Sequence, residues 1–174
     1  GVPITVIDKI ALKFGMPMGP IELADTVGLD ICLHVAENLA ESMPITVPEY
    51  LRDLVNKKIL GKKTGQGFYT FKKDKKVKPK DNKNYTPPTD VKERLILIML
   101  NETMACLREH VAESKDLIDA GIIFGTGFAP FHGGPLQYVK DRGQEQVLMA
   151  LENLEKSHGS RFKPDEGWKT IAIE

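Results

Sequence analysis

Apolar residues recur three and four positions apart along most of this chain, which is the spacing of an amphipathic helix. In the first half the pattern predicts a helix that ends at Phe14, a short helix that begins at Pro20 and another that opens at Pro48. Between the last two, one helix carries an apolar stripe made of Cys32, Val35, Ala36, Leu39, Ala40 and Met43. In the helix that opens at Pro48, the residues expected to face inward are Tyr50, Leu51, Leu54 and Val55.

The second half opens with the most apolar helix of the chain. Its apolar seam, spaced three and four residues apart, consists of Leu97, Leu100, Met104, Leu107 and Val111. One end of this helix is apolar on every side, which indicates deep burial, and Asn101 lies within it. Further helices are predicted over residues 114–124, around 136–139 and across 147–154. Because no alternating β pattern of consequence appears, the predicted class is all-α.

Two segments look like copies of one design. Residues 14–20 and 124–130 both read Phe-Gly, two variable residues, an apolar residue, a small residue and Pro, at a constant offset of 110. An Ile-Asp pair precedes each segment, at Ile7-Asp8 and at Ile118-Asp119. A Gly-Pro pair, Gly19-Pro20, ends the first segment, and Gly134-Pro135 follows the second somewhat later. A duplicated helix–loop–helix unit is the simplest explanation.

The repeat predicts two related helical units and no Rossmann sheet. We expect a first copy over residues 1–71, a lysine- and proline-rich linker over 72–91, and a second copy with a C-terminal tail over 92–174. A long apolar helix precedes Asp119, whereas only seven residues precede Asp8. The first copy is therefore expected to be truncated at its N-terminus.

Charge is unevenly distributed although the formal net charge is zero. Residues 57–83 hold eleven lysines against Asp74 and Asp81, so the rest of the chain is acidic. A basic stretch of this kind can attract phosphate. Since residues 72–83 contain Asn, Asp and Pro and almost no apolar side chains, a solvated linker is the favoured interpretation. The lysines also lack interleaved aromatic residues to stack bases, so no nucleic-acid partner is expected.

The cysteines and apolar runs limit the setting of the protein. No apolar run approaches the roughly 20 residues of a membrane-spanning helix, so no membrane span is expected. Residues 1–4 show no charged segment or long apolar stretch of a signal peptide. Cys32 and Cys106 each lie among helical apolar residues and are interpreted as reduced thiols in a reducing compartment.

Two motifs of the first half resemble the C-terminal region of the L-3-hydroxyacyl-CoA dehydrogenase family. Residues 14–30 read Phe-Gly-Met-Pro-Met-Gly-Pro-Ile-Glu-Leu-Ala-Asp-Thr-Val-Gly-Leu-Asp, and residues 60–69 read Leu-Gly-Lys-Lys-Thr-Gly-Gln-Gly-Phe-Tyr. Residues 101–107 and 124–135 resemble the second copy found in multifunctional enzymes, such as the α-subunits of the fatty acid oxidation complex. The resemblance covers nearly the whole chain.

This resemblance implies oxidation of a 3-hydroxyacyl-CoA to the 3-ketoacyl-CoA, with NAD as the hydride acceptor. In the family a Rossmann domain holds NAD and supplies a catalytic His–Glu pair. Neither that histidine motif nor a Gly-rich fingerprint after a strand occurs here, since residues 61–67 are basic and flanked by helix. We therefore expect no catalytic, cofactor-binding or metal-binding residue in this chain, poor NAD binding and no turnover by the chain alone.

The implied partners are the acyl-CoA substrate, a Rossmann domain missing from the front of the same chain, and a thiolase subunit. The implied location is the cytoplasm for a bacterial protein, and the mitochondrial matrix or peroxisome for a eukaryotic one. A non-catalytic acyl-CoA-binding or assembly module is the alternative function. The presence of an upstream Rossmann domain would distinguish the two.

Met18, Gly19, Pro20 and Leu23 are the candidate substrate-binding residues. Their loop is expected to point a helix N-terminus outward, and small residues allow a ligand close to the backbone. By the resemblance, this loop borders the acyl chain. The alternative is a rigid turn between helices with no ligand.

Other polar residues receive a structural interpretation. A lone His34 near Cys32 is weak support for a metal site. His110 and His158 suit helix ends, and His132 in the second Gly/Pro loop has no carboxylate close in sequence. Lys62 and Lys63 could meet CoA phosphates, although a solvated turn is preferred. Phe162 and Trp168 are expected to dock the C-terminal tail, and Asn101 is the counterpart of an asparagine that belongs to the helix missing at the front.

Overall fold

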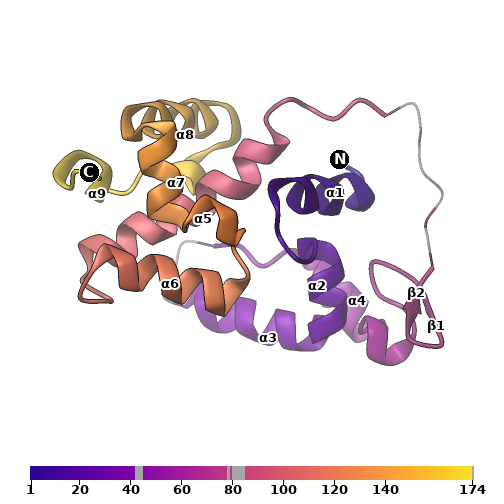
Figure 1. Ribbon diagram of the computed structural model, residues 1–174. Helices are drawn as coiled ribbons and strands as arrows, with labels where there is room; N and C mark the ends of the chain where they lie inside the picture. Colours follow the sequence, from indigo (N-terminus) through magenta and orange to yellow (C-terminus); the bar gives the residue numbers. More distant parts are fainter. Residues whose placement is uncertain (42–44, 78, 80–84, 174) are drawn as a thin grey trace. The chain divides into compact units, whose positions relative to one another are not determined.

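The computed structural model describes residues 1–41, 45–77, 79 and 85–173, and these form an essentially helical protein (Figure 1). The helices are α1 (Ile4–Phe14), α2 (Pro20–Val27), α3 (Leu29–Ala40), α4 (Glu49–Asn56), α5 (Val91–Arg108), α6 (Lys115–Thr126), α7 (Pro135–Arg142), α8 (Gln144–His158) and α9 (Gly167–Thr170). Three short 3₁₀ turns are η1 (Lys62–Thr64), η2 (Pro130–His132) and η3 (Ser160–Phe162). Among the described residues, the strands are limited to an antiparallel hairpin, β1 (Phe71–Lys72) and β2 (Lys75–Lys76). The all-α prediction is confirmed.

The chain divides into two compact units. The first comprises Gly1–Ala11 and Met18–Pro87, and the second Leu12–Pro17 and Pro88–Glu174. The division after Pro87 falls inside the segment expected as a linker. Residues 72–76 of that segment form most of the hairpin, while Lys78 and residues 80–84 lie outside the described part of the chain.

The first unit has a small core. Its buried apolar side chains include Leu29, Leu54, Tyr69 and Phe71. Tyr50 was expected to face inward, but it is 62% exposed, and its ring lies beside Phe68 with centroids 6.2 Å apart. The two-turn helix α4 buries Leu54 alone, because a unit of this size cannot cover both sides of every helix. The predicted α3 stripe is likewise half exposed, at Val35 and Leu39, and its last member, Met43, lies outside the described residues.

The core of the second unit is built on α5, which packs against α6, α7, α8 and α9. Its fully buried members include Leu97, Leu100, Met104, Phe128, Val139, Val147 and Leu151. The apolar seam predicted for this helix is confirmed except at its end. Helix α5 ends at Arg108, His110 adopts a positive φ of 55°, and Val111 is 68% exposed. The left-handed backbone at His110 carries Val111 away from the seam.

The repeat is present, but its register differs from the Phe-Gly match. Phe14 ends α1 and is 4% exposed, whereas Phe124 lies inside α6 and is 88% exposed. Helix α1 is followed by Gly15 at φ 108°, and α6 by Gly127 at φ 72°. The positions that truly correspond are the aspartates and the Gly-Pro pairs, as described below.

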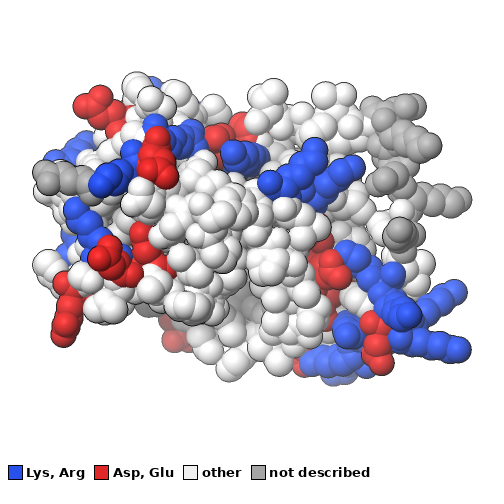
Figure 2. Space-filling view, viewed as in Figure 1, with Lys and Arg blue, Asp and Glu red and all other residues white. Residues whose placement is uncertain are grey.

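Positive charge gathers on one part of the first unit. Figure 2 shows blue Lys and Arg side chains over the region that Figure 1 labels α4, β1 and β2. The three segments that contribute them are the end of α4, η1 and the hairpin. In the part of the chain that the structure describes, no helix is both long enough and apolar enough to cross a membrane.

Candidate functional site

The candidate loop leads into α2, and the carboxylate of Asp8 holds the start of that helix. Asp8 Oδ1 accepts a hydrogen bond from the Ile21 amide at 2.8 Å, and Oδ2 accepts one from Glu22 at 3.1 Å. Helix α2 has no cap from its own N-cap residue, Gly19. A Cβ at Gly19 would overlap the Asp8 side chain, so only glycine fits there. A buried carboxylate thus takes the place of the usual local cap and complements the helix dipole.

This geometry corrects the reason for expecting a ligand at the loop. Two amides of the α2 N-terminus already donate to Asp8, and Gly19 is buried against that side chain rather than open to a ligand. The loop instead presents apolar side chains. Leu23 is 47% exposed, Pro20 is exposed and Met18 is half-buried. Such a surface suits a hydrocarbon chain and offers little to an anion.

Tyr69, which lies just before β1, also donates a hydrogen bond to Asp8. Its hydroxyl donates to Asp8 Oδ2 at 2.8 Å, and both groups are buried. Asp25 in turn fixes the backbone beside Tyr69, since its carboxylate accepts from the Phe68 amide at 2.9 Å and the Tyr69 amide at 2.7 Å. The three side chains therefore connect α1, α2 and the segment before β1 into one hydrogen-bonded network.

The protonation of this network follows from its burial. Desolvation raises the pKa of Asp25, the two backbone amides oppose that effect, and the negative charges of Asp8 and Glu22 add to it. Burial also raises the pKa of Tyr69, and its hydrogen bond to Asp8 adds to the increase. Tyr69 is thus a fixed donor at neutral pH. The network has the properties of a structural support and not those of a general base.

Two of the three glycines in residues 61–67, Gly61 and Gly67, are explained by Asp25 rather than by a nucleotide. A Cβ on Gly61 would overlap the Asp25 backbone, and one on Gly67 would overlap its carboxylate. Thr64 Oγ1 accepts from the Leu60 amide at 3.0 Å and closes the turn. The glycines face the inside of the unit and follow no parallel strand in the described chain, so this segment does not fit NAD.

The lysines of the same turn differ in their surroundings. Lys63 Nζ donates to the two carboxylate oxygens of Asp30 at 2.5 and 2.7 Å. This pairing holds the pKa of Asp30 below its usual range. Lys62 pairs with no described carboxylate. Of the two lysines, Lys63 thus has an ion-pair partner and Lys62 has none among the described residues.

The second unit repeats the aspartate clamp. Asp119 Oδ1 accepts from the Leu136 amide at 2.7 Å and Oδ2 from Gln137 at 3.0 Å, at the start of α7. A Cβ on Gly134 would overlap Asp119, just as one on Gly19 would overlap Asp8. Burial raises the pKa of Asp119. Among the described residues no side chain donates a hydrogen bond to Asp119. The second unit therefore has no described counterpart of Tyr69.

Asn101 has a structural role in the second unit. Its Oδ1 accepts from the Asp165 amide and from Trp168 Nε1, both at 2.8 Å, and its Nδ2 donates to the Lys163 carbonyl at 3.1 Å. These bonds tie the C-terminal segment to α5, and Phe162 and Trp168 are buried beside them. The expected docking of the tail is confirmed.

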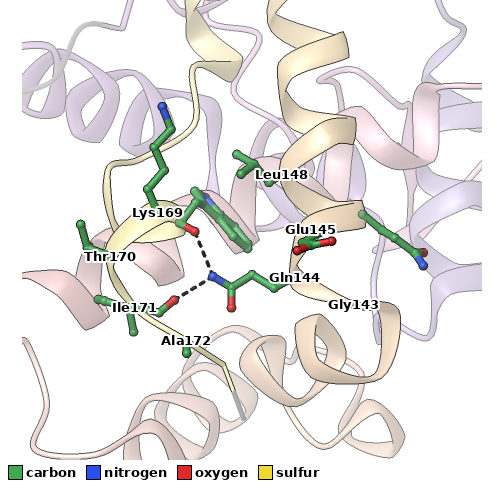
Figure 3. Close-up of a pocket in the computed structure, with 10 residues that line it drawn as sticks. Gly143, Gln144, Glu145, Leu148, Lys169, Thr170, Ile171 and Ala172 are labelled. Carbon is green, nitrogen blue, oxygen red and sulfur yellow. Dashed lines mark hydrogen bonds between the residues drawn. The ribbon is translucent and has the colours of Figure 1, made fainter.

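A cavity of about 760 Å³, which the sequence pattern does not predict, lies where this tail crosses α8 (Figure 3). Gln144 Nε2 donates to the carbonyls of Trp168 at 2.9 Å and Ile171 at 2.7 Å, and its Oε1 accepts from the Ile173 amide. The side-chain amide is thus occupied by the tail. No periodic signal in the sequence marks such a contact, because it depends on where the tail returns.

The histidines are accounted for by packing and surface pairs. His132 lies among the rings of Phe14, Phe131 and Tyr138, with centroids 4.6, 4.4 and 4.9 Å away. His158 pairs with Asp90 at 2.6 Å. Among the described residues no group of three or more His, Cys, Asp or Glu side chains could hold a metal ion. Cys32 and Cys106 are both free thiols.

Comparison with known proteins agrees with this arrangement. Residues 1–71 match the family model described as "3-hydroxyacyl-CoA dehydrogenase, C-terminal domain". The chain is similar to "Fatty acid oxidation complex subunit alpha" of Idiomarina loihiensis (39% identity, 94% of this chain, 25% of the relative). It is likewise similar to the protein of that name from Shewanella halifaxensis (34% identity, 100% of this chain, 26% of the relative). The chain thus spans about a quarter of the length of these curated relatives.

Two solved structures share the fold. One is 3-hydroxybutyryl-CoA dehydrogenase from Escherichia coli K12, with a TM-score of 0.75 and 18% identity over 99% of this chain and 55% of that chain. The other is the dehydrogenase part of multifunctional enzyme 1 from C. elegans, with a TM-score of 0.69 and 24% identity over 99% of this chain and 43% of that chain.

These findings define a helical domain of the 3-hydroxyacyl-CoA dehydrogenase C-terminal type over residues 1–71, followed by a second helical unit with its own aspartate clamp. Residues 1–71 therefore belong to the C-terminal domain of that family, and the whole chain is similar to the fatty acid oxidation complex subunits named above.

Proposed function

We propose that this chain is the C-terminal region of a multifunctional fatty acid β-oxidation enzyme. The parent enzyme oxidises an L-3-hydroxyacyl-CoA to the 3-ketoacyl-CoA with NAD, and this region shapes the acyl-CoA cleft. The observation that carries the proposal is similarity along 94–100% of the chain to proteins named fatty acid oxidation complex subunit alpha. The apolar surface of the α2 loop supports an acyl ligand.

The division of labour follows from the residues present. NAD, when bound, accepts hydride from the substrate carbon, and it belongs to a Rossmann domain of the same chain. This chain supplies no catalytic residue. Met18, Pro20 and Leu23 contact the acyl chain, while Gly19 permits the close approach of Asp8 that sets the course of the loop. Tyr69 and Asp25 keep that support rigid.

The proposed parent enzyme also implies the further partners of this chain. They are the acyl-CoA substrate and a thiolase subunit that consumes the ketoacyl product, with no role for nucleic acid. A cytoplasmic location fits the bacterial relatives, and the free thiols Cys32 and Cys106 fit a reducing compartment.

A chimaera tests the acyl-binding role. The matching quarter of the Idiomarina loihiensis relative is replaced by residues 1–174, and dehydrogenase activity is followed through NADH formation. Leu23→Ala removes three exposed carbons from the loop, so KM for long acyl chains should rise about tenfold. KM for a short acyl chain and kcat should change little.

Leu117→Ala is the matched control, because Leu117 is an exposed leucine on α6 of the other unit. We expect this variant to leave both constants unchanged. If Leu117→Ala impairs long-chain substrates and Leu23→Ala does not, the loop of the first unit is not the acyl site. Acyl-CoA binding by the chain, without any dehydrogenase activity in the chimaera, would favour a non-catalytic binding module.

A further inference from the structure

Six lysines of the first unit form one basic surface (Figure 2). We call it the lysine surface, and it consists of Lys57, Lys58, Lys62, Lys72, Lys73 and Lys75. All are exposed except Lys62, which is half-buried. They come from the end of α4, from η1 and from the hairpin, and backbone hydrogen bonds hold the η1 turn together and join it to the hairpin. Gly61 donates to the Gln66 carbonyl at 2.8 Å, and Phe71 donates to the Gly65 carbonyl at 2.8 Å.

The charge of this surface is not balanced within the described chain. Residues 57–77 contain eight lysines and a single acidic residue, Asp74. Lys63 pairs with Asp30 and Lys76 with Glu22, both on the neighbouring helices α2 and α3. No described carboxylate forms an ion pair with any member of the lysine surface. Of the eight lysines in residues 57–77, two are thus paired, and the other six form no ion pair with a described carboxylate.

The hairpin holds like charges together. Lys72 and Lys75 are directly opposite in the β1–β2 register, where like charges destabilise a pair of strands. Lys73 and Asp74 form the two-residue turn with positive φ values of 49° and 62°. Such a turn costs less with Asn-Gly than with Lys-Asp. The fold thus tolerates repulsion and turn strain at the position where a polyanion would relieve the repulsion.

The composition of the surface indicates the kind of polyanion. Residues 57–77 contain no arginine, although arginine is enriched in protein interfaces and suited to recognising nucleic-acid phosphates. None of these lysines lines the cavity beside Gln144, and their side chains are spread over an open surface. The same segments carry two exposed residues with apolar surface: Val77 follows β2, and Tyr50 lies on α4 beside Phe68. Lysines spread over an open surface with a few apolar neighbours match binding to an anionic membrane.

We propose that the lysine surface binds the surface of an anionic lipid bilayer. The lysines attract the headgroups over a distance of about one Debye length, roughly 10 Å at 0.1 M salt. Tyr50 and Val77 then enter the headgroup region. This association is peripheral and requires no membrane-spanning helix. It does not depend on the dehydrogenase assignment.

Vesicle co-sedimentation of the 174-residue chain tests the proposal. The chain should bind vesicles of phosphatidylglycerol and phosphatidylcholine at low salt, bind pure phosphatidylcholine at least tenfold more weakly, and dissociate as salt is raised. The triple variant Lys72→Glu, Lys73→Glu, Lys75→Glu should bind the anionic vesicles on the order of 100-fold more weakly. Circular dichroism verifies that the variant is folded.

The matched control changes the same charge elsewhere. Lys140, Lys156 and Lys169 are exposed lysines of the second unit, and their replacement by Glu should reduce binding only a few-fold. The proposal is overturned if both triple variants lose binding equally, if neutral vesicles bind as well, or if no vesicle binds. It is also overturned if single-stranded RNA or polyglutamate binds the chain more tightly than the anionic vesicles do.

Discussion

Asp25 illustrates how one buried side chain determines the residues around it. Its backbone and carboxylate contact two glycines, 61 and 67, and its oxygens accept from the amides of Phe68 and Tyr69. The Gly-Lys-Lys-Thr-Gly-Gln-Gly segment can be recognised in the sequence, but the contact with Asp25 that requires its glycines cannot. Asp25 lies more than thirty residues earlier, and no periodic pattern connects the two.

Gly67→Ala should reveal this contact. The added methyl would overlap the Asp25 carboxylate, so we expect the free energy of unfolding to fall by about 2–3 kcal/mol in chemical denaturation. Gly121→Ala is the control, because Gly121 lies in α6 with open space around it. That variant should gain about 0.5–1 kcal/mol from helix propensity. Equal stability of the two variants would contradict the packing assigned to Gly67.

Tyr69→Phe removes one donor from Asp8 and leaves the ring in place. Because the acceptor is buried and charged, the loss should be about 1–3 kcal/mol in the free energy of unfolding. Tyr50→Phe should change stability by less than about 0.5 kcal/mol, since Tyr50 is largely exposed. A Tyr69→Phe protein as stable as the parent would show that the hydroxyl does not support Asp8.

Asp165 gives a pH-dependent prediction. Arg108 Nε and Nη2 donate to its carboxylate, both at 2.9 Å, and hold its pKa below the usual value of 3.8. A depressed carboxyl pKa stabilises the fold above 3.8, and this contribution is lost as pH falls through the lower, folded-state value. Asp165→Asn should therefore be less stable than the parent at neutral pH, and the difference should shrink below about pH 3.8.

Arg108→Gln removes the partner of Asp165, so it should abolish the same pH-dependent part of the free energy of unfolding. Thermal unfolding followed over a pH series measures both variants. A stability difference that stays constant through the acid range would show that the ion pair is not its origin.

At the scale of elements, the helix order and most helix boundaries could be predicted from apolar spacing and from Gly and Pro. The unit repeat could also be predicted, because the Ile-Asp and Gly-Pro pairs are local. Its register could not. Gly15 and Gly127 end the two first helices at different distances from the Phe-Gly pairs, so Phe14 is buried and Phe124 is not.

The two aspartate clamps should act separately. Asp8→Ala removes two hydrogen bonds at the start of α2, and Asp119→Ala removes two at the start of α7. Each should cost about 2–3 kcal/mol, because the bonds are to a buried charge. Hydrogen exchange should become faster at the Ile21 and Glu22 amides in the first variant alone.

The second variant should show the corresponding change at Leu136 and Gln137. Faster exchange at all four amides in both variants would mean that the clamps are not independent structural elements. The aspartates could be located from the sequence, but their role as caps could not, because each bond spans thirteen or more residues.

For the whole molecule, the resemblance of short motifs predicted the family and the helical class, and the comparisons agree. The candidate loop was located correctly as a turn between α1 and α2, while the chemistry expected of its backbone was wrong because Asp8 occupies the amides. The hairpin was assigned to a linker because lysines dominate residues 72–76. Its pairing depends on backbone bonds from the Gly65–Thr70 region, which composition does not encode.

The most direct test of the central claim compares NADH formation from an L-3-hydroxyacyl-CoA by this chain alone and by the chimaera with the Idiomarina loihiensis relative. The account predicts no turnover by the chain, with kcat/KM of the chimaera within about tenfold of the relative's own value. Turnover by the isolated chain, or a folded chimaera that binds NAD but leaves the substrate unoxidised, would contradict it.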